Sequence, residues 1–285
     1  MIYSRIRGGL GNQLFQYCMA RSLADKLNTS LGLDTRDFDD HSPYSMGLEN
    51  FNIRADFNPA GMIEHKKNGY FKYLLDIMIG KHKYVYKEPY LHFDKNVTSL
   101  PNNSYLKGYW QSEKYFKDNR ENILNDLSII RNQSNQNKKL SEQIANTVSV
   151  SLHIRRGDYI SNSGYNANHG TCSLTYYENA VSYLIKNIGK KFTVFTFSDD
   201  PEWVYSNLKL PVDICFVNNN SSEHSYEDLR LMSECNHNII ANSSFSWWGA
   251  WLNTSNNKTI IAPSKWYANR YIENNDIVPP DWIRI

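Results

Sequence analysis

The sequence predicts an α/β protein built from two Rossmann-like domains with parallel sheets. Short apolar strands alternate with helical segments in both halves of the chain, and this alternation is typical of parallel sheets with right-handed crossovers. A polar stretch without hydrophobic periodicity, Ile129–Gln143, separates the halves. The 285 residues also exceed what one hydrophobic core usually contains. We therefore expect one domain over residues 1–135 and a second over 145–285, facing each other across a cleft.

The first half begins with a strand, a glycine turn and a helix. Ile2–Arg7 is short and β-branched at intervals, and Gly8–Asn12 is too rich in glycine to continue a strand. Apolar residues from Leu14 to Leu27 recur about every 3.6 residues, which predicts an amphipathic helix. Leu31–Asp34 is the next expected strand.

Three further elements are expected before the domain boundary. Apolar residues of Phe71–Met78 share one helical face, and Tyr105–Trp110 has the composition of a strand. Ser112 can then cap a helix that runs to about Leu127.

The second half alternates more regularly. Val148–Ile154 has period-two alternation, typical of a strand. Gly189 would end a helix, Pro201 suits the first position of one after an Asp200 cap, and Ser225–Asp228 has a capping-box pattern. Further strands are expected at Phe192–Phe197, Ile214–Val217, Asn238–Ala241 and Thr259–Ala262, and helices at Tyr176–Ile188, after Pro201, from Ser225 to Cys235 and at Trp247–Leu252.

Composition excludes several classes of protein. Lys and Arg number 31 and Asp and Glu 29, so no general positive field would hold a nucleic acid. The four cysteines form no CxxC pair, which argues against a zinc ribbon. No apolar stretch approaches the ~18 residues of a membrane span, and no signal-peptide pattern follows Met1. We therefore expect a cytoplasmic protein with reduced thiols.

Four polar segments of the second half lie where a predicted strand ends or a predicted helix begins. Ligands of parallel sheets bind beyond the carboxyl ends of the strands. Adjacent arginines offer forked donors for phosphate oxygens, and hydroxyls and N–H groups before a helix also bind phosphate. Carboxylates can accept hydrogen bonds from a guanine edge or from ribose hydroxyls. The segments are Arg155–Asp158, Ser198–Asp200, Ser225–Asp228 and Asn242–Ser246, and together they predict a nucleoside diphosphate site.

Each of these segments also has a purely structural interpretation. Arg156 could close a surface turn by pairing with Asp158, and Asp200 could serve only as a helix cap, which leaves no acidic pair for a metal. Asp228 could be only the capping-box partner of Ser225. The three tryptophans of the last helix, Trp247, Trp248 and Trp251, are expected in the core.

A second hypothesis is an NAD-type oxidoreductase. Gly9-x-Gly11 matches part of a dinucleotide fingerprint, and Asp34 lies roughly where a ribose-binding acid would. Leu14 occupies the third glycine position, however, and no constellation for hydride transfer is visible.

Six stretches taken together resemble the bacterial α-1,2-fucosyltransferases. The resemblance spans nearly the whole chain, and its His-x-Arg-Arg motif is shared more widely with α-1,6- and protein O-fucosyltransferases. The stretches are Gly8–Tyr17, Gly108–Glu113, His153–Tyr159, His169–Leu174, Phe197–Asp200 and Asn242–Gly249.

This resemblance implies a GT-B-like fold and an inverting transfer of L-fucose from GDP-β-L-fucose to the 2-hydroxyl of a galactose residue, with no required metal or cofactor. Arg155 would bind the β-phosphate and stabilise the leaving GDP, and Asp228 would accept from guanine. The loop of Gly11 and Asn12 would face the acceptor. The predicted donor site also includes His153, Arg156, Ser198, Asp199, Asn242, Ser243, Ser244, Phe245 and Ser246.

The general base and the acceptor remain open. Asp158 and His169 are the catalytic candidates near the arginines, and Glu113 and Asp34 are candidates in the first half. Sugar contacts are expected from Tyr109, Trp110 and the Asp34–His41 loop, whose alternatives are ordinary packing and a solvated turn.

Three alternatives accompany the fucosyltransferase hypothesis. They are a fucosyltransferase of another linkage or for another GDP-sugar, the oxidoreductase, and a catalytically silent binder of GDP or glycan. The basic amphipathic stretch Tyr70–Lys87 could contact the inner face of a membrane that carries a lipid-linked glycan, or it could be a core-facing helix. No nucleic-acid partner is expected.

Overall fold

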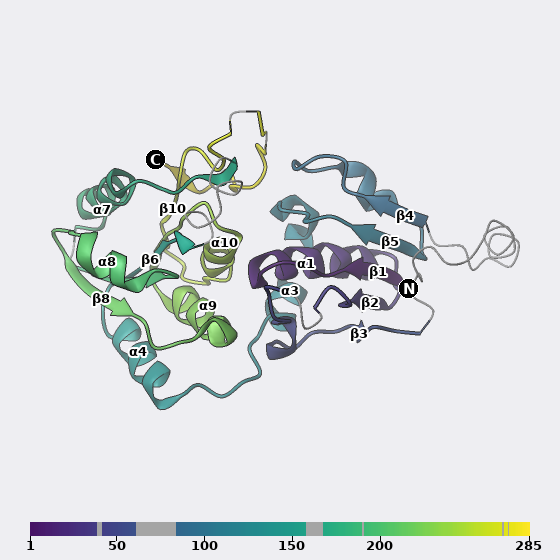
Figure 1. Cartoon of the computed structure of the whole chain (residues 1–285), viewed down its shortest axis with the longest axis horizontal. Helices are drawn as coiled ribbons and strands as arrows, with labels where there is room; N and C mark the ends of the chain where they lie inside the picture. The colour runs from purple at the N-terminus through teal and green to yellow at the C-terminus, as the bar shows by residue number, and fades with distance from the viewer. Residues whose placement is uncertain (39–41, 61–83, 158–167, 190, 270, 273) are drawn as a thin grey trace, which may run out of the picture. The chain divides into compact units, whose positions relative to one another are not determined.

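A computed structural model describes residues 1–38, 42–60, 84–157, 168–189, 191–269, 271–272 and 274–285. The chain divides into two compact units, Met1–Ser128 and Ile129–Ile285, each with its own sheet (Figure 1). All pairings between the strands of these sheets are parallel.

The first unit is a five-stranded sheet with order β3-β2-β1-β5-β4. Tyr3 of β1 pairs with Gly32 of β2 on one side and with Tyr105 of β5 on the other, so β1 is central. The long helix α1 follows β1 and packs against it. The elements are β1 Ile2–Arg5, α1 Leu10–Lys26, β2 Leu31–Asp34, η1 Leu48–Asn50, β3 Asp56–Phe57, β4 Tyr84–Lys87, η2 Lys95–Ser99, β5 Ser104–Lys107, η3 Glu113–Tyr115, η4 Lys117–Asn119 and α3 Arg120–Asp126.

The second unit is a six-stranded sheet with order β11-β10-β9-β6-β7-β8. Its central strand β6 is buried along its whole length, as expected of a parallel strand covered on both faces. The elements are α4 Asn135–Ala145, β6 Ser149–Ile154, α7 Leu174–Ile188, β7 Thr193–Ser198, α8 Pro201–Asn207, β8 Asp213–Val217, η5 Ser222–His224, α9 Ser225–Glu234, β9 His237–Ile239, α10 Ser244–Trp251, β10 Ile260–Ala262 and β11 Ile283–Arg284.

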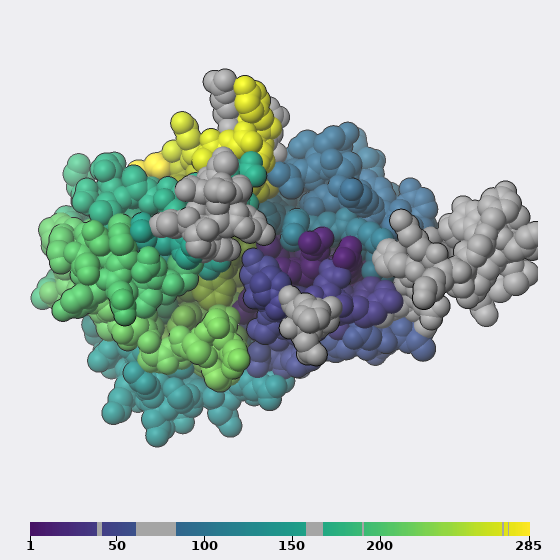
Figure 2. All heavy atoms as spheres, in the orientation of Figure 1, coloured from purple at the N-terminus to yellow at the C-terminus, as the bar shows by residue number. Residues whose placement is uncertain are grey.

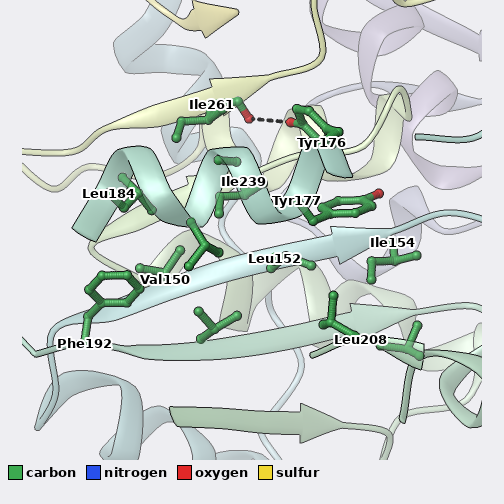
Figure 3. Close-up of a cluster of buried hydrophobic side chains, with 14 residues drawn as sticks. Val150, Leu152, Ile154, Tyr176, Tyr177, Leu184, Phe192, Leu208, Ile239 and Ile261 are labelled. Carbon is green, nitrogen blue, oxygen red and sulfur yellow. Dashed lines mark hydrogen bonds between the residues drawn. The ribbon is translucent and has the colours of Figure 1, made fainter. Parts of the chain in front are cut away.

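Helix α7 covers the middle of this sheet, where β6 supplies Val150 and Leu152 to a buried cluster (Figure 3). The hydroxyl of Tyr176 donates to the carbonyl oxygens of Ile240 at 2.7 Å and Ile261 at 3.3 Å, which ties the start of α7 to β10 and to the end of β9. Gly189 ends the helix in a left-handed conformation, φ 63°, as predicted.

Most predicted strands and helices are present within a few residues of their expected bounds, and β3, β4 and β11 were missed. The prediction of a buried tryptophan face is confirmed, because Trp247, Trp248 and Trp251 are at most 3% exposed. The indole N–H of Trp247 donates to the carbonyl oxygen of Ile277 at 2.6 Å.

The predicted linker Ile129–Gln143 is wrong in part, since it contains helix α4 of the second unit. The hydroxyl of Ser134 accepts from the backbone N–H of Asn137, and this cap starts the helix. Leu140 and Ile144 then pack against the cluster that includes Phe195. Because most residues of α4 are polar, and Leu140 and Ile144 are its only large apolar side chains, the helix looks like a linker in the sequence. The teal atoms of α4 border the green atoms of α9 in Figure 2.

The predicted continuous helix from Ser112 to Leu127 is also wrong. Ser112 does act as a cap, but of the 3₁₀ turn η3, and η4 and α3 follow as separate pieces. Phe116 leaves the helical region at φ −142°, ψ 0°. Because of this break, the adjacent rings of Tyr115 and Phe116 are both buried in the core. In an unbroken helix the two side chains would point about 100° apart.

The proposed membrane-contacting stretch Tyr70–Lys87 lies mostly outside the described residues, as does the expected helical face Phe71–Met78. Its last part, Tyr84–Lys87, is strand β4 and not helix. Among the residues that the structure describes, no helix is both long and apolar enough to cross a bilayer.

A buried ion-pair network anchors α1 to α3 in the first unit. The Asp126 side chain is 1% exposed and contacts Nε of Arg21 at 2.8 Å and Nε of Arg54 at 3.2 Å. The Tyr17 hydroxyl donates to the same carboxylate at 2.7 Å. A charge removed from water to this extent stabilises the fold only while its partners are present.

Replacing Asp126 with Ala should therefore destabilise the protein by about 3 kcal/mol, since the Tyr17 hydroxyl and Arg21 lose a buried acceptor and, among the described residues, Arg21 keeps only its pair with Asp25. Urea denaturation would measure this change. Asp118→Ala removes an exposed carboxylate from η4 of the same unit and should change the free energy of unfolding by less than about 0.5 kcal/mol. Equal effects of the two substitutions would contradict the network.

Candidate functional site

The strand order creates a topological switch point in the second sheet. From β6 the chain moves to β7 and β8 on one side, and from β9 it moves to β10 and β11 on the other. Helices that follow these two strands therefore diverge, and ligands of such sheets bind in the crevice beyond the carboxyl ends. The ends of β6 and β9 lead into two of the segments predicted from the sequence, Arg155–Asp158, which the structure describes up to Gly157, and Asn242–Ser246.

The register of β6 with β7 aligns Arg155 with Asp199. Ile154 pairs with Ser198 at the end of both strands, so the next residues emerge side by side. Nη1 of Arg155 lies 3.1 Å from Oδ2 of Asp199. The backbone N–H of Arg156 donates to Oδ1 of Asp199 at 2.8 Å. Asp199 thus orients the guanidinium, whose side chain remains 27% exposed at the sheet edge.

Gly157 makes room for this carboxylate. A Cβ atom at position 157 would lie 2.5 Å from Oδ2 of Asp199, the oxygen that faces Arg155. No pair of such atoms approaches this closely, so a side chain at this position would displace the Asp199 carboxylate.

Arg156 has different neighbours from Arg155. Its guanidinium carbon lies 3.5 Å from the ring centroid of Trp203, and its Nε lies 3.2 Å from Oδ2 of Asp200. Asp200 caps α8 through Oδ1, which accepts from the N–H of Trp203, so the predicted helix cap is confirmed. Ser198 shapes the same turn, because its hydroxyl accepts from the N–H of Asp200. The geometry thus assigns Arg156 a structural contact and gives Arg155 the better placement for a ligand.

His153 is a neutral imidazole at the end of β6. Burial, with a smaller contribution from the Arg155 charge, lowers the pKa of His153 to about 3. Its ring is 5.7 Å from that of Phe245, which links β6 to the start of α10 across the switch point. His153 therefore places a polar but uncharged side chain next to Arg155.

The segment before α10 divides into structural and more exposed residues. Ser243 caps the helix by accepting from the N–H of Phe245, and the buried Ser246 hydroxyl donates to the Ser243 carbonyl oxygen. Ser244 and Phe245 are half-buried at the first turn. The N-terminal turn of α10 therefore offers a hydroxyl and helix N–H groups of the kind that bind phosphate.

Asn242 organises the surrounding loops. Its side-chain amide donates to the carbonyl oxygens of His169, Gly170 and Trp266 at 3.0 to 3.2 Å. The sequence predicts that Asn242 contacts the sugar-nucleotide donor. In the structure its side chain is 3% exposed, and its amide donates to backbone carbonyl oxygens. His169 is held beside it, with its ring 5.2 Å from that of Tyr267. Asp158, the other catalytic candidate here, lies outside the described residues.

The carboxylate of Asp228, in α9, is held by a residue of the loop before that helix. The interpretation of a capping box with Ser225 is wrong, because α9 begins with His224 as its N-cap, without a side-chain cap bond. Oδ1 of Asp228 instead accepts from the Asn220 amide at 2.7 Å. Burial raises the pKa of Asp228 to about 6, so the carboxylate is largely ionised at neutral pH.

Polar residues also meet in the first sheet, at the carboxyl ends of the adjacent strands β1 and β5. The Gln111 amide, past the end of β5, donates to Oδ1 of Asn12 in the first turn of α1 at 2.7 Å. Gly11 is buried in that turn. Asn12 and Gln111 together thus form a polar rim at the carboxyl ends of β1 and β5.

Glu88 shapes the backbone of this rim and was missed by sequence analysis. Its carboxylate accepts from the N–H groups of Tyr109 at 2.6 Å and Trp110 at 2.9 Å, and burial raises its pKa. A Cβ at Gly108 would lie 2.4 Å from Cβ of Glu88, and Trp110 adopts φ +57°. These contacts explain why β5 ends at Lys107, before the predicted end at Trp110. Tyr109 lies under the Arg7 guanidinium at 5.8 Å, and Trp110 is fully buried.

Two glutamines, also missed, hold the glycine turn. The Gln13 amide donates to the carbonyl oxygens of Gly8 and Ser45, while its oxygen accepts from the N–H of Gly47. Oε1 of Gln16 accepts from the N–H of Arg7. Both side chains are fully buried, so these polar residues of the motif have a structural role.

Asp34 does not support a dinucleotide site. Its carboxylate accepts from Nε and Nη2 of Arg36 and from the Tyr105 hydroxyl. Burial opposes its ionisation, but these hydrogen bonds outweigh burial and lower the pKa of Asp34 to about 2. Its lowered pKa makes it a poor general base, and both of its oxygens already accept from Arg36 or Tyr105 instead of a ribose. Within the described part of the chain, no three His, Cys, Asp or Glu side chains form a candidate metal site.

Comparison with known proteins agrees with this architecture. The model of glycosyl transferase family 11 matches residues 65–285. Two Escherichia coli proteins are each 35% identical over all of this chain: an alpha-1,2-colitosyltransferase, of which 99% is covered, and the O-antigen biosynthesis glycosyltransferase WbnK, covered completely.

Among solved structures, the fucosyltransferase NodZ from Bradyrhizobium matches with a TM-score of 0.52 at 14% identity, over 87% of this chain and 91% of NodZ. The expected fold, two Rossmann-like α/β units with parallel sheets of the GT-B kind, is therefore confirmed. Family match, full-length relatives and fold together establish that this chain belongs to glycosyl transferase family 11.

Proposed function

We propose that this glycosyltransferase transfers L-fucose from GDP-β-L-fucose to the 2-hydroxyl of a galactose residue, forming an α-1,2 linkage with inversion. The observation that carries the proposal is the Arg155 guanidinium, which Asp199 holds at the switch point of the second sheet. A nucleoside diphosphate leaving group needs a fixed positive charge at such a place.

The proposed step is a single displacement. The bond from the fucose anomeric carbon to the β-phosphate oxygen breaks, and its electron pair stays on GDP. The acceptor oxygen bonds to the same carbon, and its proton passes to a base. Negative charge grows on the β-phosphate as the bond breaks, so a guanidinium that is already oriented stabilises the transition state more than the ground state.

The other residues of the proposed donor site lie near Arg155 or on neighbouring loops of the second unit. The first turn of α10, with Ser244 and Phe245, would receive the phosphates and sugar. His153 stays neutral and can border the nucleotide without competing with Arg155 for the anion. The ionised Asp228 carboxylate would accept from the guanine edge.

The acceptor half of the proposal rests on the first unit. Asn12 and Gln111 offer polar atoms at the carboxyl ends of β1 and β5, and Tyr109 offers a ring on which a sugar could stack. The WbnK relative acts in O-antigen biosynthesis, which supports a surface polysaccharide as the acceptor. We propose that the enzyme works in the cytoplasm, at a membrane that carries the growing glycan.

GDP-colitose is the competing donor, because one full-length relative is a colitosyltransferase. Colitose is L-fucose without the 3-hydroxyl, so the two donors differ by one hydrogen-bonding group. A site that pairs with this hydroxyl would reject the deoxy sugar strongly, whereas an apolar site would discriminate little.

Acceptor-dependent GDP release in EDTA is the first test. With GDP-fucose and a panel of galactosides, we expect release that persists in EDTA and an α-1,2 product by NMR. Faster turnover of GDP-colitose would replace the fucosyl proposal with a colitosyl one. GDP binding without turnover of either donor would favour a silent binder.

Arg155→Ala should reduce kcat by on the order of 10²–10³, the usual loss on removing one such donor. Arg155→Lys keeps the charge but loses the fork, and should recover only part of the rate. The matched control is Lys209→Ala, which removes an exposed cation of the same unit. More than half of the wild-type kcat in a folded Arg155→Ala protein would contradict the assignment.

Gly157→Ala should lower kcat by about 10-fold or more, because the new Cβ displaces Asp199 and leaves the Arg155 guanidinium misdirected. Steady-state assays together with melting curves would separate this effect from unfolding. Ser206→Ala on α8 serves as the control for a small surface change. A Gly157→Ala enzyme with unchanged kcat would show that the Asp199 position is irrelevant to the reaction.

A further inference from the structure

Three asparagines and one carboxylate form a directional hydrogen-bonded chain in the second unit. The Asn219 amide donates to Oδ1 of Asn137 at 2.5 Å, and the Asn137 amide donates to Oδ1 of Asn220 at 2.9 Å. The Asn220 amide then donates to Oδ1 of Asp228 at 2.7 Å. The chain joins α4, the loop after β8 and α9, and it ends on the carboxylate expected to contact guanine.

Burial makes this chain specific. Asn137 is 1% exposed, so its amide and carbonyl must find partners inside the protein. An asparagine side chain can be turned over to exchange its donor and its acceptor. Oδ1 of Asn220 accepts from the amides of Asn137 at 2.9 Å and Asn219 at 3.2 Å, so the amide nitrogen of Asn220 is directed to Asp228. Asn137, with the shorter contact, therefore acts together with Asn219 to select the group that Asn220 presents to the carboxylate.

This orientation matters for the protonation of Asp228. Burial favours the neutral carboxyl, and the nearby Glu227 charge also favours it, whereas the Asn220 amide stabilises the ionised form. With Asn220 reversed, its carbonyl oxygen would face Asp228 and favour a protonated carboxyl. The asparagine chain thus keeps Asp228 as an acceptor, with Oδ1 engaged and Oδ2 not used in the chain.

We propose that Asn137 and Asn220 are positioning residues that select guanine as the donor base by holding Asp228 as an ionised acceptor. The inference rests on the proposed function, in which Asp228 contacts the base. Guanine presents N1–H and N2–H donors on one edge, which an ionised carboxylate accepts. Adenine presents an acceptor at N1, so the same carboxylate repels it.

The test is the ratio of dissociation constants for ADP and GDP, measured by calorimetry at pH 7.5. Asn137→Leu removes the amide at nearly constant volume. It should weaken GDP binding about 10-fold, on the scale of one hydrogen bond to a charged group, and leave ADP binding nearly unchanged. The matched control is Asn146→Leu at the exposed end of the same helix, which should keep both constants.

Inosine diphosphate, which lacks the 2-amino group, separates the two guanine donors. Wild type should bind it more weakly than GDP, and the difference should shrink in Asn137→Leu. Where Asn137→Leu does not fold, Asn219→Ala is the alternative: it removes a half-buried amide that donates to both Asn137 and Asn220. It should change the ratio in the same direction, by less, because the shorter bond from Asn137 to Asn220 remains.

A pH series adds a readout that a purely structural role would not move. GDP affinity should fall below pH 6 in wild type, and at a higher pH in Asn137→Leu, because the pKa of Asp228 then rises further. Asp228→Asn corrects for titration of the phosphate, which is common to all proteins in the series.

An unchanged ADP-to-GDP ratio in folded Asn137→Leu and Asn219→Ala would overturn the inference. Equal weakening of ADP and GDP would also overturn it, because it would indicate a general loss of structure. Wild-type protein that binds no GDP would overturn the proposed function itself, and this outcome is visible before any variant is made.

Discussion

The ion pair between Arg155 and Asp199 is the interaction on which the proposed chemistry depends. It follows directly from sheet register, since Ile154 and Ser198 pair at the ends of β6 and β7 and the next residue of each strand carries one partner. Asp199 also accepts the backbone N–H of Arg156, and Gly157 leaves space for it. A single carboxylate thus fixes the direction of one guanidinium, and the parallel sheet supplies the rigid support that such preorganisation requires.

Both units use the same architectural device. In each sheet, polar side chains meet beyond the carboxyl ends of two adjacent inner strands, β1 and β5 in the first and β6 and β9 in the second. In the first unit Gln111 reaches Asn12, while Glu88 fixes the backbone that leads to Gln111. Many polar residues of the two motifs, such as Gln13, Gln16 and Asn242, bind backbone groups and so hold the loops at the carboxyl ends of the strands.

The sequence predicted more of the fold than of the site's supporting contacts. Strand alternation, the Gly189 stop and the Asp200 cap are local features, and each was found. Arg155 could be predicted because it follows a strand end, but its pairing with Asp199 depends on the register between two strands whose paired residues are 44 positions apart in the sequence. The Asn137 chain was hidden in a segment that looks like a linker, since α4 is mostly polar and has only Leu140 and Ile144 as large apolar side chains.

The most direct test of the account is a double-mutant cycle on kcat between Arg155→Lys and Asp199→Asn. If Asp199 acts by orienting Arg155, loss of Asp199 should matter little once the fork is gone, with a coupling energy of about 0.5–3 kcal/mol. The double variant would then be nearly as active as Arg155→Lys alone. Additive losses, with a coupling energy near zero, would contradict the central claim that this carboxylate works through the arginine.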